Sequence, residues 1–178
     1  VSGPADDGQG LSGKRVFIRV DFNVPQDKKT QAITDDARIR EALPTIELCV
    51  KGGAKVVLAS HLGRPKGQVD ATFSMVPVGE RLAELTGWEV LVPEDCGGDA
   101  PKAVIHKLRA GQVVLLENLR YHAEEEANDE AFAAQLAELC DVYVNDAFGT
   151  AHRAHASVHA LPKLMRDRAA GLLMQKEL

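Results

Sequence analysis

The chain has 178 residues, of which 45% are hydrophobic and 26% charged, and its formal net charge is −5 at pH 7. A chain of this length and composition can bury one sizeable core, which argues against disorder. The acidic balance argues against a nucleic-acid or membrane-surface partner, since both select basic faces, and no apolar stretch approaches membrane-spanning length.

Residues 1–11 are predicted to form a flexible leader. The sequence GQGLSG, which begins at Gly8, matches the dinucleotide-binding pattern G-x-G-x-x-G, and with Lys14 it nearly matches a P-loop. Both motifs require glycines that follow a strand and open a helix, so that backbone amides meet the phosphates. Here the glycines precede the first predicted strand, and Arg15 replaces the P-loop Ser or Thr, so neither site is expected.

Five short apolar runs predict strands. They are rich in valine and alternate only weakly, as expected of strands in a parallel sheet that is covered by helices on both faces. The runs are RVFIRV (15–20), KVVLAS (55–60), WEVLV (88–92), QVVLLEN (112–118) and DVYVND (141–146).

Helical patterns separate these runs. Apolar residues recur at spacings of three and four in 39–50, 78–85 and 132–139. This alternation predicts an α/β fold: a doubly wound, Rossmann-like three-layer sandwich with a mainly parallel sheet of about six strands. Pro44 is expected to kink or split the first helix, because proline removes a backbone donor.

Two further segments have a predicted role. The acidic stretch EEEANDE, from Glu124, indicates a loop and a solvated helix start. The final residues, GLLMQKEL, begin a helical pattern and stop without a cap, so we expect the chain to be part of a longer protein.

Polar residues follow four of the five predicted strands. In an open parallel sheet, the loops at the carboxyl ends of the strands form the ligand crevice. The third strand is instead followed by acidic PEDCGGD, which predicts an edge strand away from any anion site. Three arginines at one rim of an acidic protein predict a phosphate or carboxylate site, because guanidinium groups pair bidentately with oxyanions. The candidates are Asp21, Asn23, His61, Arg64, Arg120, His152 and Arg153.

Arg38 is a further candidate. The sequence TDDARIR predicts a helix start with Thr34 or Asp35 as the cap and acids in the first turn. A cation in that turn opposes the helix dipole, which a functional role would explain. Local pairing of Arg38 with Asp35 is the alternative.

Each candidate alone has an ordinary explanation as a turn residue, a packed histidine or a surface arginine. Their joint occurrence at strand ends favours one site. His152 and His155 have the i, i+3 spacing of some metal sites, but no third ligand is near in sequence, so no metal is expected. His155 and His159 are alternatively packing residues or hold the loop.

Four motifs, RVDFNVP, SHLGRP, LLENLRY and NDAFGTAHRAHAS, closely resemble the phosphoglycerate kinase family, specifically its amino-terminal domain. The resemblance implies that residues 12–170 form this domain and that 171–178 begin the interdomain helix. It also implies reversible phosphoryl transfer from 1,3-bisphosphoglycerate to magnesium ADP, giving 3-phosphoglycerate and ATP. The nucleotide-binding carboxyl-terminal domain of the family is absent from this sequence.

The resemblance also implies roles for the candidates. Asp21 and Asn23 would contact the hydroxyl and carboxylate region of the glycerate. Arg38 would be the catalytic residue that reaches the transferred phosphoryl group, and His152 and His155 would support the loop. The charged groups of the substrate, chiefly the non-transferred phosphate, would be held by His61, Arg64, Arg120 and Arg153.

The expected partners are 3-phosphoglycerate or 1,3-bisphosphoglycerate and the missing carboxyl-terminal domain, in a monomer. Magnesium ADP or ATP would bind only in the full-length enzyme, so this chain alone should bind 3-phosphoglycerate weakly and be inactive. Three widely spaced cysteines fit a reducing cytoplasm, or the plastid of a photosynthetic eukaryote. The competing hypotheses are a non-catalytic anion-binding domain and a metal-dependent hydrolase.

Overall fold

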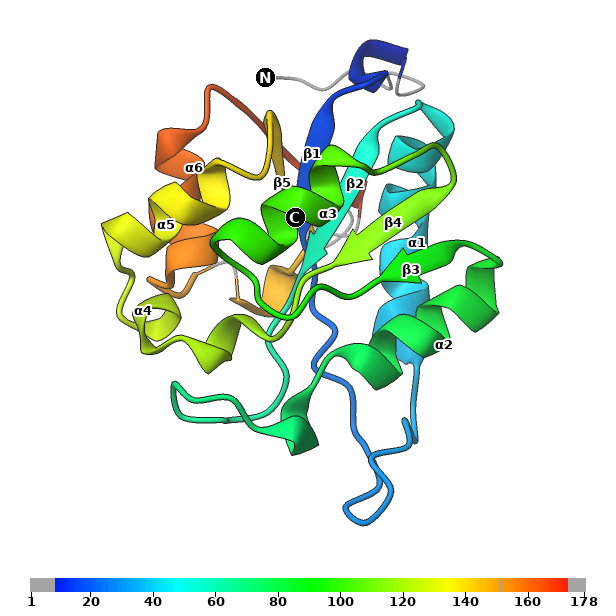
Figure 1. Ribbon diagram of the computed structural model, residues 1–178, viewed down its shortest axis with the longest axis vertical. Coiled ribbons are helices and arrows are strands. Elements are labelled where there is room, and N and C mark those ends of the chain that lie inside the picture. Colours follow the sequence, from blue (N-terminus) through cyan, green and yellow to red (C-terminus); the bar gives the residue numbers. More distant parts are fainter. Residues whose placement is uncertain (1–8, 151, 173–178) are drawn as a thin grey trace.

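One open sheet of parallel strands forms the centre of the molecule (Figure 1). The structure is a computed structural model and describes residues 9–150 and 152–172 of the chain. Within these residues the sheet has six strands in the order β3-β4-β2-β1-β5-β6. The strands are β1 (Arg15–Arg19), β2 (Lys55–Ala59), β3 (Glu89–Leu91), β4 (Gln112–Leu115), β5 (Val142–Asn145) and β6 (Asp167–Ala170).

Helices and single helical turns connect the strands. The α-helices are α1 (Ala37–Lys51), α2 (Val76–Thr86), α3 (Asp99–His106), α4 (Ala123–Glu126), α5 (Glu130–Ala137) and α6 (Leu161–Leu164). The 3-10 turns are η1 (Gln9–Leu11), η2 (Ala71–Phe73), η3 (Leu119–Tyr121) and η4 (Phe148–Thr150), and η5 (Ala156–Ala160) is a π-helical turn.

The sheet is buried on both faces, which makes a three-layer sandwich. Successive strand residues point to opposite faces, so Val16 and Ile18 of β1 enter one buried cluster with α1 and α2. Phe17 enters the other cluster, with α3, α5, η5 and α6. The near-continuous apolar runs of the sequence follow from this burial on both sides.

The predicted α/β fold with a parallel sheet of about six strands is confirmed. Each of the five apolar runs contains one strand, and the third, β3, is an edge strand as expected. The sixth strand, β6, lies at the other edge and was not identified. Its sequence, DRAA, is mostly exposed and has neither an apolar run nor β-branched residues.

The start of α1 differs from the prediction. Asp36 is the N-cap residue, and neither Thr34 nor Asp35 takes that place. The acids expected in the first turn precede the helix, where Asp35 Oδ1 accepts a hydrogen bond from Ala37 N at 2.9 Å.

Pro44 does not split α1, which is one helix from Ala37 to Lys51. Pro44 is exposed, so the missing backbone N–H lies on the side of the helix that faces solvent. Buried residues on either side of it in sequence, among them Ala42 and Ile46, pack in the cluster that includes β1 and β2. Tertiary packing therefore offsets the cost of the proline.

The acidic stretch from Glu124 is only partly solvated, so this prediction was wrong for one residue. Glu125 is fully buried in α4. Its carboxylate accepts hydrogen bonds from the backbone N and the hydroxyl of Ser157, at 2.7 and 2.5 Å. Asp129 caps α5 by accepting from Phe132 N.

The predicted end segments are described only in part. In the predicted leader 1–11, Gln9–Leu11 form η1, and Leu11 packs against the core. Residues 1–8 lie outside the described residues. The same is true of residues 173–178 of the predicted interdomain helix. Leu172 N donates to Thr45 Oγ1 of α1 at 2.8 Å. Among the described helices, none is both long and apolar enough to cross a membrane.

Replacing Gly67 with alanine should destabilise the fold more than the same change at Gly87. Both glycines have a left-handed backbone, with φ of +76° and +75°, so alanine adds about 1–2 kcal/mol of strain at each. A Cβ at Gly67 would also lie 2.9 Å from Ala123 Cβ and 3.2 Å from its backbone N, whereas nothing lies within 4 Å at Gly87. Urea unfolding should show a further loss of about 1–3 kcal/mol for Gly67→Ala. Equal losses would contradict the tight contact.

Candidate functional site

The carboxyl ends of β1, β2, β4 and β5 meet at one rim of the sheet. These strands are adjacent and parallel, and backbone hydrogen bonds continue beyond their ends. Leu119 N donates to Ser60 O at 3.1 Å, and Asp146 N donates to Arg19 O at 2.8 Å. The loops that carry the predicted site residues therefore start from a common edge, as the sequence analysis expected.

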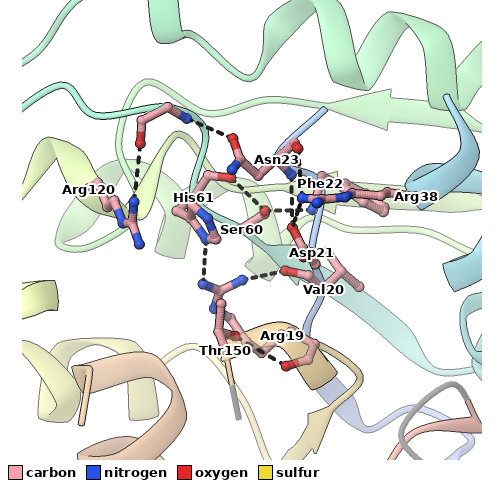
Figure 2. Close-up of polar contacts among 12 residues, drawn as sticks. Arg19, Val20, Asp21, Phe22, Asn23, Arg38, Ser60, His61, Arg120 and Thr150 are labelled. Carbon is pink, nitrogen blue, oxygen red and sulfur yellow. Dashed lines mark hydrogen bonds and ion pairs between the residues drawn. The ribbon is translucent and has the colours of Figure 1, made fainter. Parts of the chain in front are cut away.

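Asp21, Asn23 and Arg38 are in contact at this rim (Figure 2). Arg38 Nη1 lies 3.2 Å from Asp21 Oδ1 and donates to Asn23 O at 2.9 Å. Asn23 Oδ1 accepts from Gly63 N at 2.9 Å, which ties the loops after β1 and β2 together. Arg38 therefore pairs with Asp21 and not with Asp35, the alternative partner. Its position at the start of α1 brings it to the loop after β1.

His61 is buried at the same rim, with 5% of its surface exposed. Its Nδ1 lies 2.9 Å from Nη2 of Arg19, the last residue of β1. Arg19 is also buried and was not among the predicted site residues. The sequence did contain a signal for it, because an arginine inside an otherwise apolar run is costly to bury without a specific partner.

Arg120 is held on the loop after β4. Its side chain is 8% exposed, and Nη1 donates to Gly63 O at 3.2 Å. Nε lies 3.7 Å from Glu126 Oε1 and has no hydrogen-bond partner within the described residues. A buried guanidinium with an unused donor is suited to receive an oxyanion.

Asn118 positions this loop and was also missed, because it falls within the predicted strand run 112–118. Its Oδ1 accepts from Leu62 N at 3.2 Å and from Arg120 N at 3.0 Å. Its Nδ2 donates to Leu62 O at 2.6 Å and to Phe73 O at 3.0 Å. One buried amide therefore joins the loops that follow β2 and β4.

The remaining candidates are more exposed. Arg64 is exposed next to Gly63, the residue that contacts both Asn23 and Arg120. Arg153 and His152 are exposed in the loop after β5. His155 is half-buried, and its Nδ1 has no hydrogen-bond partner within the described part of the chain.

The electrostatics show that positive charge converges on His61. Burial, followed by the charges of Arg19, Arg120 and Arg153, lowers the pKa of His61 to about 2. Burial and the neighbouring Arg153 and Arg19 likewise lower the pKa of Arg120. His61 is therefore neutral among arginines, and the rim is locally electropositive in a chain of net charge −5.

The described residues also line hollows apart from the arginine cluster. A hollow of about 570 Å³ lies between the start of α1 and α2 and is mainly acidic: Asp35, Asp36, Glu80 and Glu84 line it, with Arg81, which pairs with Asp36 and Glu84. Another, of about 590 Å³, is also basic and is lined by Arg15, Lys55, Lys102, His106 and Lys107 together with Glu138. It lies at the opposite, amino-terminal ends of β1 and β2, and two of its cations already have ion-pair partners, Arg15 with Asp141 and Lys102 with Glu138. A smaller one, of about 200 Å³, borders the rim at Asn23 and Gly63.

One group of metal-type donors occurs within the described residues. It consists of Asp95, Cys96 and His122, whose ligand atoms lie within 4.8 Å of one another. His122 Nε2 lies 2.6 Å from Asp95 Oδ1, and burial raises the pKa of the Cys96 thiol well above its usual range. A hydrogen-bonded histidine beside a protonated thiol explains this group, and it includes neither His152 nor His155.

Comparisons with known proteins agree on one family. A profile of the phosphoglycerate kinase family matches residues 6–178. Phosphoglycerate kinase of Anaeromyxobacter sp. (strain Fw109-5) is 57% identical over 173 residues, covering 96% of this chain and 43% of that protein. The chloroplastic phosphoglycerate kinase of Volvox carteri is 54% identical over 168 residues, covering 94% and 36%.

A solved structure has the same fold. Phosphoglycerate kinase from Coxiella burnetii superposes with a TM-score of 0.80 at 39% identity, covering 94% of this chain and 41% of that one. The chain therefore spans less than half the length of the relatives that it matches, about 43% of the Anaeromyxobacter protein.

Replacing His61 with glutamine should flatten the pH dependence of stability. The pKa of His61 is about 2 in the folded chain and about 6.5 when unfolded, so below pH 6.5 only the unfolded state takes up the proton. The wild type should therefore lose about 2 kcal/mol more than His61→Gln between pH 7.5 and pH 5, by urea unfolding. Carboxylate titration is common to both proteins and cancels in the difference. Parallel curves would contradict a neutral buried imidazole.

Proposed function

The chain belongs to the phosphoglycerate kinase family, and from this premise we propose that it supplies the glycerate-binding half of a phosphotransferase. The reaction is reversible phosphoryl transfer from 1,3-bisphosphoglycerate to ADP, which gives 3-phosphoglycerate and ATP. The observation that carries the proposal is the electropositive rim, where Arg19, Arg120 and Arg153 all act on the buried His61.

The roles of the site residues follow from their positions. Arg120, with its unused buried Nε donor, and the exposed Arg64 and Arg153 would hold the charged groups of the substrate, chiefly the non-transferred phosphate. His61 would donate a hydrogen bond among them. Both phosphate and carboxylate accept such charge-assisted bonds, which are stronger than neutral ones.

Asp21, Asn23 and Arg38 would form the other side of the site. Asp21 and Asn23 would contact the hydroxyl and carboxylate region of the glycerate. Arg38 is held by Asp21 but its side chain stays 49% exposed, so its charge is available at the rim. It would stabilise the transferred phosphoryl group, as positioning and electrostatics dominate this chemistry. His152 and His155 would support the loop.

The nucleotide would bind outside this chain. We place magnesium ADP or ATP on the carboxyl-terminal domain of the full-length protein, a monomer of the cytoplasm or of the plastid. The adjoining half would close over the glycerate and exclude water from the transfer.

Alanine at Arg64 or Arg120 should each weaken binding of 3-phosphoglycerate by about 1.5–3 kcal/mol, the usual contribution of a charged hydrogen bond. Titration calorimetry on the chain measures this directly. Arg109→Ala is the matched control and should bind normally, because Arg109 is exposed and precedes the start of β4.

Arg38→Ala should leave the affinity of the full-length protein for 3-phosphoglycerate unchanged and lower its turnover. Equal loss in all four variants, or equal affinity of the chain for phosphate and 3-phosphoglycerate, would favour a non-catalytic anion-binding domain.

The 178-residue chain should bind 3-phosphoglycerate but produce no ATP from 1,3-bisphosphoglycerate and magnesium ADP. The physical reason is that phosphoryl transfer needs the nucleotide phosphates in line with the acceptor, and this chain contributes the glycerate side. A coupled ATP assay decides the point, with full-length protein as the positive control. ATP production by the chain alone would refute the proposal that the nucleotide binds only to the carboxyl-terminal domain.

A further inference from the structure

A run of buried polar contacts begins at Arg19, whose residue is 1% exposed. Nε donates to Ser157 Oγ at 2.9 Å, Nη1 donates to Val20 O, and Nη2 lies 2.9 Å from His61 Nδ1. Figure 2 shows the guanidinium between the imidazole of His61 and the backbone carbonyl of Val20, the residue after β1. The guanidinium of Arg19 thus directs its hydrogen-bond donors to three protein groups.

Glu125 lies at the far end of this run. It is fully buried, and Ser157 Oγ donates to its Oε2 at 2.5 Å. The Ser157 hydroxyl has one proton, which it donates to Glu125, so towards Arg19 its oxygen acts as the acceptor. The negative charge of Glu125 raises the pKa of Arg19 against the lowering effect of burial. A carboxylate on α4 therefore balances the buried guanidinium.

The contact between Arg19 and His61 fixes the protonation of the imidazole. A guanidinium has donors and no acceptor, so Nδ1 of His61 must accept and cannot carry a proton. A neutral imidazole then carries its proton on Nε2. The charged form would place an Nδ1–H against the Arg19 N–H.

We infer that Arg19 is a positioning residue that holds His61 as the neutral Nε2–H tautomer, so that His61 is a fixed hydrogen-bond donor to the bound oxyanion. The second half of this inference rests on the proposed function. The opposite tautomer would present a lone pair to a phosphate or carboxylate oxygen and repel it. In metal sites, a hydrogen bond to one ring nitrogen of a histidine likewise fixes the tautomer, so that the other nitrogen faces the ligand in the required protonation state.

The groups around His61 all favour the neutral form. The main charge effects on it come from Arg19 on β1, Arg120 on η3, and Arg153 and His155 in the loop after β5, and each lowers its pKa. No acid acts on His61 among these groups. The donor should therefore keep its proton on Nε2 between pH 8 and pH 5.

Nitrogen-15 NMR of the imidazole side chains, recorded without ligand, tests the inference. The His61 signals, assigned by their loss in His61→Gln, should show a protonated Nε2 and a bare Nδ1, unchanged from pH 8 to pH 5. In urea the same ring should titrate near ~6.5. A protonated Nδ1, or a ring that takes up a second proton in the folded chain above pH 5, would overturn the inference from the wild-type spectrum itself.

Variants separate positioning from packing. Arg19→Met combined with Glu125→Gln removes both buried charges, which avoids an unpaired carboxylate, and should let His61 populate both tautomers and weaken 3-phosphoglycerate binding about tenfold. Glu125→Gln alone keeps the contact between Arg19 and His61, although the guanidinium then lacks its balancing carboxylate, and in its folded form this control should keep the wild-type tautomer. An unchanged tautomer in the folded double variant would overturn the role of Arg19. A wild type with the expected tautomer but no affinity for 3-phosphoglycerate would refute the proposed function and leave the tautomer assignment standing.

Discussion

The parallel pairing of β1 with β2 on one side and β5 on the other is the constraint on which the site depends. Parallel pairing brings the carboxyl ends of neighbouring strands to one rim, so residues more than a hundred positions apart become neighbours. The bond from Arg19 to Ser157 spans 138 positions. The apolar clusters on both faces hold the strands in this register, because a slip of one residue would exchange the two faces of every strand.

The site concentrates positive charge on a chain that is acidic overall. Burial makes each charge more effective, since fewer waters screen it, and it also makes each unpaired charge costly. The structure meets both demands by giving the deeper groups protein partners. Arg19 is balanced by Glu125 through Ser157, while the more exposed Arg38 and Arg153 keep contact with solvent.

Much of this organisation was predictable from the sequence. Valine-rich runs identified β1 to β5, and polar residues after them located the rim. The strand β6 was missed because its residues are mostly exposed and carry no apolar signal. Asn118 was missed because it ends a run that was assigned to a strand, and Glu125 because it lies in an acidic run that predicts a solvated segment. Arg19 was missed although an arginine inside an apolar run is itself a signal. Their partners are distant in sequence, so only tertiary structure reveals why burying them is tolerated.

Within the described residues, β3 and β6 form the two edges of the sheet, and their sequences have a consequence for association. The outer strands β3 and β6 each present charged residues, Glu89 on one side and Asp167 and Arg168 on the other, and all three are exposed. The backbone N–H and C=O groups of an edge strand can pair with a strand of another chain. Charged side chains on the edge strand oppose this pairing, because they must lose water before the new strand can join the sheet. Strand-to-strand polymerisation of this chain is thereby discouraged at both margins of the sheet.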